Sequence, residues 1–196
     1  MAMTFSSFHD PSHLYFITAS LIEWKHLFII PKHAFIPLNS LAWLQQQKQI
    51  LLFAFVVMPS HLHAIFKPED GTAAEILQQF GSFTAHQILK ELKANHDEDL
   101  LNAFKQNRRD RRHRHSIWQD IQAKNIYSME FLQQKLEYIH QNPVSKEWKL
   151  VDDRADYIYS SAGDYDDGRK PIIEITDINE WLTTTPSPCL TAAKGA

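Results

Sequence analysis

An almost unbroken apolar segment, residues 51–57, is the feature that most constrains the fold of this chain. A continuous apolar run of this length is typical of a strand that is covered on both faces. Pro59 and Ser60 follow it and predict a turn, after which residues 61–66 return as an antiparallel partner strand. The chain is therefore expected to bury this hairpin in its core.

The segments around the hairpin predict two more strands and three helices. Strands are expected at residues 14–21, which are rich in aromatic and β-branched side chains, and at residues 117–126. Helices are expected from Asn39 or Ser40 to about Gln49, from the N-cap Thr72 over a long apolar-periodic segment, and from Ser128 to Asn142. Pro31 and Pro37 predict a loop before the first helix, and the polar residues 95–115 predict a mobile loop after the second.

The order strand, helix, strand, strand, helix, strand is the split βαβ pattern of a ferredoxin-like fold, an α+β class with an antiparallel sheet. The helix at residues 128–142 is then an additional C-terminal element. A length of 196 residues suits one domain, which we place at residues 1–182. Residues 183–196 are rich in Thr, Pro and Ala and are expected to form a disordered tail.

Two histidines stand one residue apart on the returning strand of the hairpin. Side chains alternate along a strand, so His61 and His63 are expected to point to the same face and Leu62 to the other. Two imidazoles within an apolar run are costly to bury unless something binds them, and a divalent cation would do so. The alternative is a pair of half-solvated histidines at the end of a strand.

The helix at residues 128–142 places a tyrosine above an asparagine. Ser128 suits its N-cap, and Pro143 restricts the preceding residue and ends the helix. Tyr138 and Asn142 are four residues apart, so they lie one above the other at the border of the apolar stripe. Tyr138 then either shows its hydroxyl to a cleft or packs as an amphipathic core residue.

Together these fragments resemble the single-tyrosine HUH transposases of bacterial insertion sequences, most of all the REP-associated tyrosine transposases. Met-Pro-Ser-His-Leu-His at residues 58–63 is similar to the family's histidine–hydrophobic–histidine motif. Tyr-Ile-His-Gln-Asn-Pro-Val at residues 138–144 is similar to its catalytic helix, and Tyr-Ile-Tyr-Ser-Ser at residues 157–161 to a segment further on. The resemblance runs from about residue 14 to about residue 175 and fits the ferredoxin-like prediction.

The resemblance implies a metal-dependent enzyme that nicks single-stranded or hairpin DNA and transfers the strand. Tyr138 would be the nucleophile and would form a covalent 5′-phosphotyrosine, freeing a 3′-hydroxyl. His61 and His63 would hold Mg²⁺ or Mn²⁺. Asn142 stands where relatives carry a further polar ligand, and C-capping of the helix is its alternative role. Glu137 and His140 are the nearest alternative ligands, but helical geometry turns both away from Tyr138.

The charges are unevenly distributed along the chain. A net charge of −3 argues against a protein that coats nucleic acid over its whole surface. One segment is strongly basic, however, and could follow a phosphate backbone. A solvated loop is the alternative for this segment, whose cations are Lys105, Arg108, Arg109, Arg111, Arg112 and Arg114.

Composition restricts the class and the location of the protein. No run of about eighteen apolar residues exists, so no membrane partner is expected. The single Cys189 cannot form an internal disulfide, which favours a reducing cytoplasm, with association to the nucleoid when DNA is bound. Strand exchange needs two cuts, so a homodimer and a monomer both stay open. The alternative function is a non-catalytic nucleic-acid-binding module, which would leave the histidine pair and Tyr138 unexplained.

Overall fold

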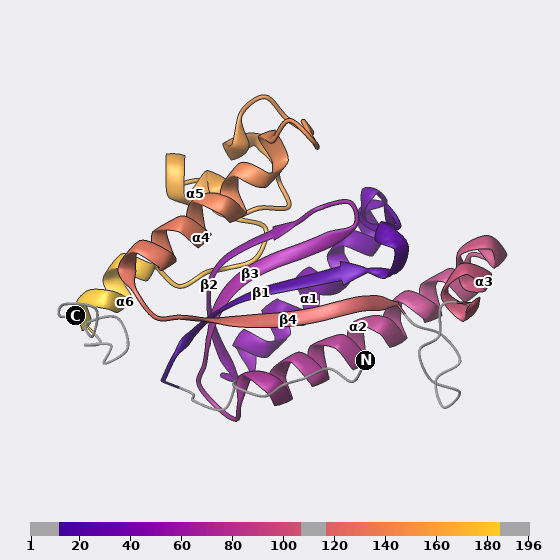
Figure 1. The fold of residues 1–196 in the computed structure, drawn as a ribbon, viewed down its shortest axis with the longest axis horizontal. Helices are drawn as coiled ribbons and strands as arrows, with labels where there is room; N and C mark the ends of the chain where they lie inside the picture. Colours follow the sequence, from indigo (N-terminus) through magenta and orange to yellow (C-terminus); the bar gives the residue numbers. More distant parts are fainter. Residues whose placement is uncertain (1–11, 107–116, 185–196) are drawn as a thin grey trace.

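The computed structural model describes residues 12–106 and 117–184 and centres on one antiparallel sheet (Figure 1). Its strands are β1 (Leu14–Leu21), β2 (Ile50–Val57), β3 (His61–Pro68) and β4 (Trp118–Ile126). Their spatial order is β2-β3-β1-β4, and every neighbouring pair is antiparallel. This order, with a helix connecting β1 to β2 and another between β3 and β4, confirms the predicted ferredoxin-like α+β fold.

Helices pack on both faces of the sheet. On one face, α1 (Pro31–Gln46) and α2 (Ala73–Ala94) pack on Tyr15, Ile17 and Leu62. On the other face, α4 (Met129–Gln141) and α6 (Ile178–Thr184) pack on Phe16 and Ile65. The two sets of strand residues alternate along the chain, because successive side chains point to opposite faces. The apolar run of β2 is accordingly divided between the two cores, as its sequence predicts.

The first helix begins much earlier than the sequence prediction placed it. It starts at Pro31, not at Asn39 or Ser40, and it ends at Gln46 instead of Gln49. Proline is well suited to the first helical position, because the N–H that it lacks would have no partner there. Pro37 lies inside the helix, where it normally removes a hydrogen bond. Buried side chains on both sides of it, Ala34 and Leu38, hold the helix against α2 despite that loss.

The predicted loop at residues 95–115 contains a helix, α3 (Glu98–Gln106). Asp97 caps it, since its Oδ1 accepts a hydrogen bond from the Leu100 N–H at 3.1 Å. Phe104 is fully buried and Leu101 nearly so, which anchors α3 to the core shared with α2. Two apolar side chains on one face thus outweigh the polar composition on which the loop prediction rested.

Short helices complete the described chain. They are η1 (Ile22–Trp24), η2 (Leu27–Ile29), η3 (Asn142–Val144), η4 (Arg154–Asp156) and α5 (Ala162–Asp167). The last helix, α6, reaches Thr184, two residues past the predicted domain boundary, and residues 185–196 of the predicted tail lie outside the described residues.

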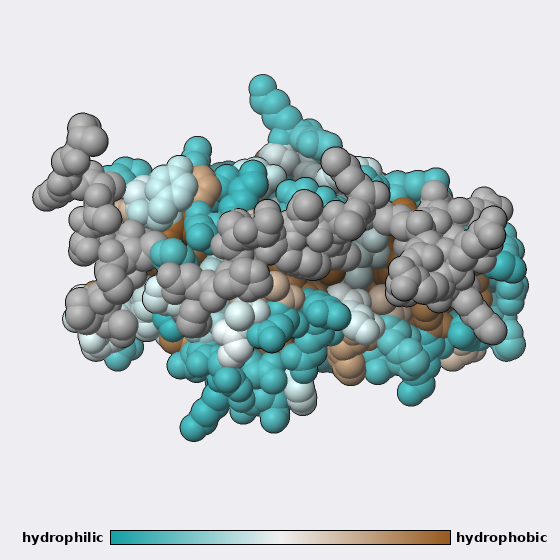
Figure 2. Space-filling model, turned by 60° about the horizontal axis from the view of Figure 1, so that its bottom comes forward, coloured by the Kyte–Doolittle hydropathy of each residue, from teal (hydrophilic) through white to brown (hydrophobic). Residues whose placement is uncertain are grey.

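The surface agrees with a domain that keeps its apolar side chains inside. Among the described residues seen in Figure 2, hydrophilic ones occupy more of the surface than hydrophobic ones, which show in smaller areas between them. Within the described ranges, no helix is both long enough and apolar enough to span a bilayer.

Candidate active site

The two histidines lie side by side on the face of the sheet that carries α4. In the register of β1 and β3, Ser20 is opposite His61 and Thr18 is opposite His63. The imidazole centroids are 5.0 Å apart, with an angle of 71° between the rings. Residue 62 points to the opposite core, as the alternation of strand side chains requires.

Both imidazoles are buried and held in their neutral form. His61 is 5% exposed and His63 is 3% exposed. Burial lowers the pKa of His61 to about 4, against a smaller opposing effect from the neighbouring side chain of Asn142. The pKa of His63 is lowered to about 3, mainly by burial and secondly by the nearby His61. Neutral imidazole is the form that can bind a metal ion.

One ring nitrogen of each histidine is fixed by a hydroxyl group. Nδ1 of His63 lies 2.9 Å from Oγ1 of Thr18, and Nδ1 of His61 lies 3.2 Å from Oγ of Ser60. The other nitrogen of His63, Nε2, is buried and has no hydrogen-bond partner among the described residues. A buried ring nitrogen without a partner is costly, and a bound cation would remove that cost.

Helix α4 brings Tyr138 onto the histidine pair. The helix begins at Ser128, whose hydroxyl accepts a hydrogen bond from the Phe131 N–H at 3.2 Å, as its sequence predicts for the N-cap. The Tyr138 ring lies 5.0 Å from that of His63 and 6.0 Å from that of Phe16, with edge-on geometry at both. Tyr138 is 47% exposed, so the phenol is anchored on one side and open to solvent on the other.

Asn142 caps the helix and faces the same cleft. Its Nδ2 donates a hydrogen bond to the carbonyl of Tyr138 at 2.7 Å. The side chain is buried and is also a partner of His61. Capping uses the amide nitrogen, so the amide oxygen of Asn142 is the atom that can face His61 or a cation. The two roles that the sequence left open for this residue do not exclude each other.

These side chains share an open cleft of about 410 Å³. Its floor is part of one sheet face. There Phe16 of β1 lies opposite Lys124 of β4, and Thr18 of β1 lies opposite His63 of β3. The full lining is Phe16, Thr18, Trp24, His61, His63, Lys124, Lys135, Tyr138, Asn142, Glu147 and Trp148.

Seven residues of this lining are absent from the sequence prediction. Lys135 could have been found, because it lies one helical turn before Tyr138. Thr18 and Lys124 could be placed only once the strand register was known. Trp24, Glu147 and Trp148 come from irregular segments, where no periodicity indicates which way a side chain points.

Lys135 brings a positive charge next to the phenol. Its Nζ lies 5.0 Å from the centroid of the Phe16 ring and 5.4 Å from that of Tyr138. Partial burial, followed by the nearby charge of Lys124, lowers the pKa of Lys135. Two ammonium groups that repel each other in one cleft would both gain from a bound anion.

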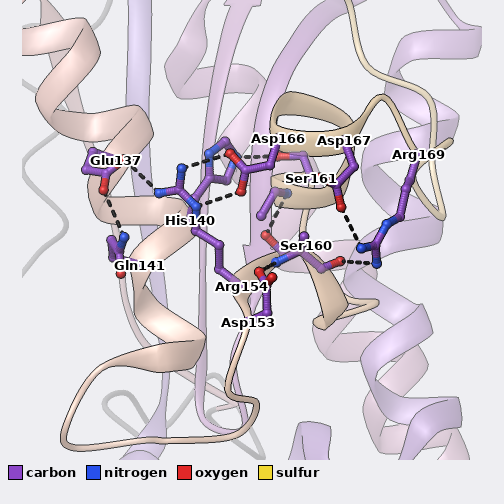
Figure 3. A network of polar contacts seen from close by, with 12 residues as sticks. Glu137, His140, Gln141, Asp153, Arg154, Ser160, Ser161, Asp166, Asp167 and Arg169 are labelled. Atoms are coloured by element: carbon purple, nitrogen blue, oxygen red, sulfur yellow. Dashed lines mark hydrogen bonds and ion pairs between the residues drawn. The ribbon is translucent and has the colours of Figure 1, made fainter.

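The described part of the chain offers two histidines to a metal ion, and no group of three or more His, Cys, Asp or Glu side chains lies close enough to hold one. The two alternative ligands named from the sequence, Glu137 and His140, have other partners (Figure 3). Nε2 of His140 lies 2.9 Å from Oγ of Ser161, and Glu137 binds Arg154 at 2.7 Å. A metal here would need oxygen from Asn142 and from water or substrate.

A polar network fixes the outer side of α4 to the chain that follows it (Figure 3). Arg154 binds both carboxylate oxygens of Asp166, at 2.7 and 2.8 Å, and also Glu137 of α4. Ser161 in turn bonds to the backbone of Phe55 in β2. The segment that resembles Tyr-x-Tyr-Ser-Ser therefore fastens the tyrosine helix to the sheet.

The predicted DNA-binding cations are only partly described. Lys105 lies in the last turn of α3, is exposed, and is not one of the residues that line the cleft. Arg108, Arg109, Arg111, Arg112 and Arg114 lie outside the described residues.

A solved REP-associated tyrosine transposase, bound to a REP hairpin, superposes on this structure with a TM-score of 0.59. The two sequences are 17% identical, and the match covers 89% of this chain and 92% of that chain. The chain has the fold of a single-tyrosine transposase.

Comparison with other proteins adds little to this likeness. A structure from Deinococcus radiodurans R1, provisionally assigned as a transposase, gives a TM-score of 0.42 at 15% identity, over 64% of this chain and 87% of that chain. No protein-family model and no curated protein matches the sequence.

Proposed function

We propose that this protein nicks single-stranded or hairpin DNA and rejoins strands through a covalent 5′-phosphotyrosine, as a single-tyrosine transposase does. The observation that carries the proposal is the convergence of Tyr138 with His61 and His63 in one solvent-open cleft. These residues come from β3 and α4, which are far apart in the sequence. The transposase-like fold supports the same reading.

Tyr138 is the proposed nucleophile. Its hydroxyl oxygen forms a bond to the phosphorus of the scissile phosphodiester while the bond from phosphorus to the 3′ oxygen breaks. The phenol loses its proton, and the departing 3′ oxygen takes one up to become a 3′-hydroxyl. The reverse reaction with another 3′-hydroxyl rejoins DNA without ATP, because the covalent intermediate retains a phosphodiester bond.

His61, His63 and Asn142 are the proposed holders of Mg²⁺ or Mn²⁺. The donor set fits: two neutral imidazoles, one with a buried and unpartnered Nε2, and one amide oxygen. When bound, such an ion supplies Lewis-acid polarisation of the non-bridging phosphate oxygens.

The two lysines of the cleft are proposed to hold the scissile phosphate. Lys124 comes from the sheet and Lys135 from α4, so their charges approach the cleft from two directions. The ammonium group of Lys135 itself lies over the rings of Phe16 and Tyr138, and this cation–π contact keeps it beside the phenol. An ammonium group placed there offsets the negative charge of the phosphate under attack.

Hairpin DNA is the proposed substrate, since the transposase of similar fold was solved with a REP hairpin. Lys105 and the arginines of residues 108–114 are proposed to contact its phosphates. His61, His63, Tyr138 and Asn142 come together within one chain, so we propose that one protomer suffices for a single cut. A second protomer would then be needed for strand exchange and not for a single cut.

A covalent-adduct assay tests the proposal. The probe is a pool of hairpin oligonucleotides with randomised single-stranded flanks, labelled at the 3′ end, with Mn²⁺ present. A protein–DNA adduct that carries the 3′ label is expected for the parent and for Tyr127→Phe, a control at an exposed tyrosine outside the cleft. Tyr138→Phe is expected to form none while it binds the pool within about twofold of the parent. Binding without adducts in the parent would favour the non-catalytic module instead.

A further inference from the structure

Two tryptophans of the cleft contact His61. The ring of Trp24 lies 5.5 Å from that of His61, edge-on at 74°. The ring of Trp148 lies 5.6 Å from that of His61 and is also in contact with His26. Both line the cleft, and Trp24 is 51% exposed. Neither residue is used by the proposed nicking chemistry.

The backbone that presents Trp24 is strained. Glu23 and Trp24 both have left-handed conformations, with φ of 50° and 52°. Such conformations are uncommon for residues with large side chains, and two in succession persist only where the surrounding structure imposes them. A turn chosen for stability alone would carry glycine or asparagine here.

The surrounding structure does impose this turn. The Leu21 N–H donates to the Ser60 carbonyl at 2.9 Å, and the Ile22 N–H donates to the Ile117 carbonyl at the same distance. The Glu23 N–H donates to the side chain of Gln119 at 3.2 Å. The turn is thus held by Ser60 of the β2–β3 connection, by Ile117 just before β4 and by Gln119 of β4. It keeps half of a large apolar ring in solvent beside the histidine pair.

We infer that Trp24 and Trp148 form a stacking site for an unpaired nucleobase next to the scissile phosphate. This inference rests on the proposed function and names a feature of its substrate, a base outside the paired stem. Aromatic faces bind bases of any sequence, because every base has a π-face. The cleft volume of about 410 Å³ is within the range of pockets that hold small molecules, roughly 300–1,000 Å³. The cations of Lys124 and Lys135 lie in the same cleft for the attached phosphate.

The test compares DNA with and without bases. Fluorescein-labelled (dT)₁₂ and an abasic chain of the same length are titrated by anisotropy against the Tyr138→Phe protein, which excludes turnover. Trp24→Gly is the deletion, since glycine adopts positive φ freely and keeps the turn. It is expected to weaken (dT)₁₂ binding by about fivefold or more and to leave abasic binding unchanged. Trp24→Phe is expected to stay within about threefold of the Tyr138→Phe parent.

Trp43 supplies the matched control, because it is 44% exposed on α1 and does not line the cleft. Trp43→Gly would disturb a helix, so Trp43→Ala is used, and it is expected to change neither affinity. An equal loss on both oligomers in Trp24→Gly, no loss on either, or no (dT)₁₂ binding by the parent would overturn the inference. Base-dependent binding without covalent adducts would keep the stacking site and reject the nuclease. Covalent adducts without base-dependent binding would keep the nuclease and reject the stacking site.

Discussion

The phenol ring of Tyr138 and the imidazole ring of His63 lie 5.0 Å apart at an angle of 68°. Each is fixed by its own element: His63 by the register of β1 and β3, and Tyr138 by the buried Leu132 and Ile139 of α4. The same phenol also contacts Phe16 of β1. Since the contact joins two packed elements, the fold itself holds the proposed site together, and such preorganisation would favour the proposed chemistry.

Thr18 is expected to control metal affinity without touching the metal. Its hydroxyl lies 2.9 Å from Nδ1 of His63 and thereby orients the ring so that Nε2 is directed away from it. Thr18→Val keeps the shape and removes the hydroxyl, and we expect about a tenfold loss in Mn²⁺ affinity. Thr18→Ser keeps the hydroxyl and is expected to retain most of the affinity. Titration of Mn²⁺ followed by electron paramagnetic resonance measures both.

His63→Ala sets the lower limit of that experiment, because it removes the proposed ligand itself. If Thr18→Val and His63→Ala both bind Mn²⁺ as tightly as the parent, the metal lies elsewhere.

Lys135 is expected to act on the rate of adduct formation more than on DNA binding. Lys135→Met keeps an unbranched side chain and removes the ammonium group that lies over the rings of Phe16 and Tyr138. We expect the adduct rate at saturating DNA to fall by about tenfold or more, because the proposed scissile phosphate would lose a positive charge beside it. Lys93→Met, at an exposed lysine of α2 on the other face of the sheet, is the control. An unchanged rate in Lys135→Met would remove the lysine from the chemistry.

The sequence predicts those parts of the site that a simple period places. Alternation along a strand puts His61 and His63 on one face, and a spacing of four puts Tyr138 above Asn142. Both arrangements are local, so the sequence alone determines them. The sequence does not place the pair beside the tyrosine, because that depends on how α4 crosses the sheet. The family resemblance supplied this step.

The features that the sequence could not predict depend on packing or on irregular backbone. Helix α1 starts at Pro31 because the position suits proline and packing against α2 holds the later turns, and α3 exists because Phe104 is buried. Trp24 reaches the cleft through two left-handed residues that are held by the β2–β3 connection and the start of β4. Such contributions from distant residues leave no periodic pattern in the segment itself.

His33 is expected to make the protein less stable in mild acid. It is 1% exposed in α1, and neither ring nitrogen has a hydrogen-bond partner in the described part of the chain. Burial lowers the pKa of His33, and the positive charge of Lys32 lowers it further. The Leu27 backbone and the acids Glu91 and Asp97 raise it by less, and the Leu27 contact is too long or too bent to count as a hydrogen bond. Between that lowered value and about 6.5, the unfolded chain binds more protons than the folded one.

The contribution of His33 to stability is therefore complete above pH 6.5 and is lost as the pH falls below it. His33→Leu removes the titrating group and with it this pH-dependent contribution to stability. The free energy of unfolding in urea, measured with EDTA present, should be lower at pH 5.5 than at pH 7.5. This decrease should be smaller in His33→Leu than in the parent, by up to about 1 kcal/mol. An equal loss in both proteins would mean that His33 is not held neutral.

Arg154 is expected to position the tyrosine helix. Its guanidinium group binds Asp166 through two nitrogens and Glu137 of α4 through the third (Figure 3). Arg154→Met breaks both contacts, and we expect unfolding in urea to require about 1 kcal/mol less, since bidentate pairs are stronger than single surface pairs. The adduct rate should fall, because α4 loses its outer anchor, while DNA affinity stays within about twofold.

Arg169→Met is the matched control: Arg169 is about half exposed and pairs with Asp156 and Asp167, neither of which belongs to α4. If the two variants lower the adduct rate equally, the network serves the stability of this segment and does not orient Tyr138.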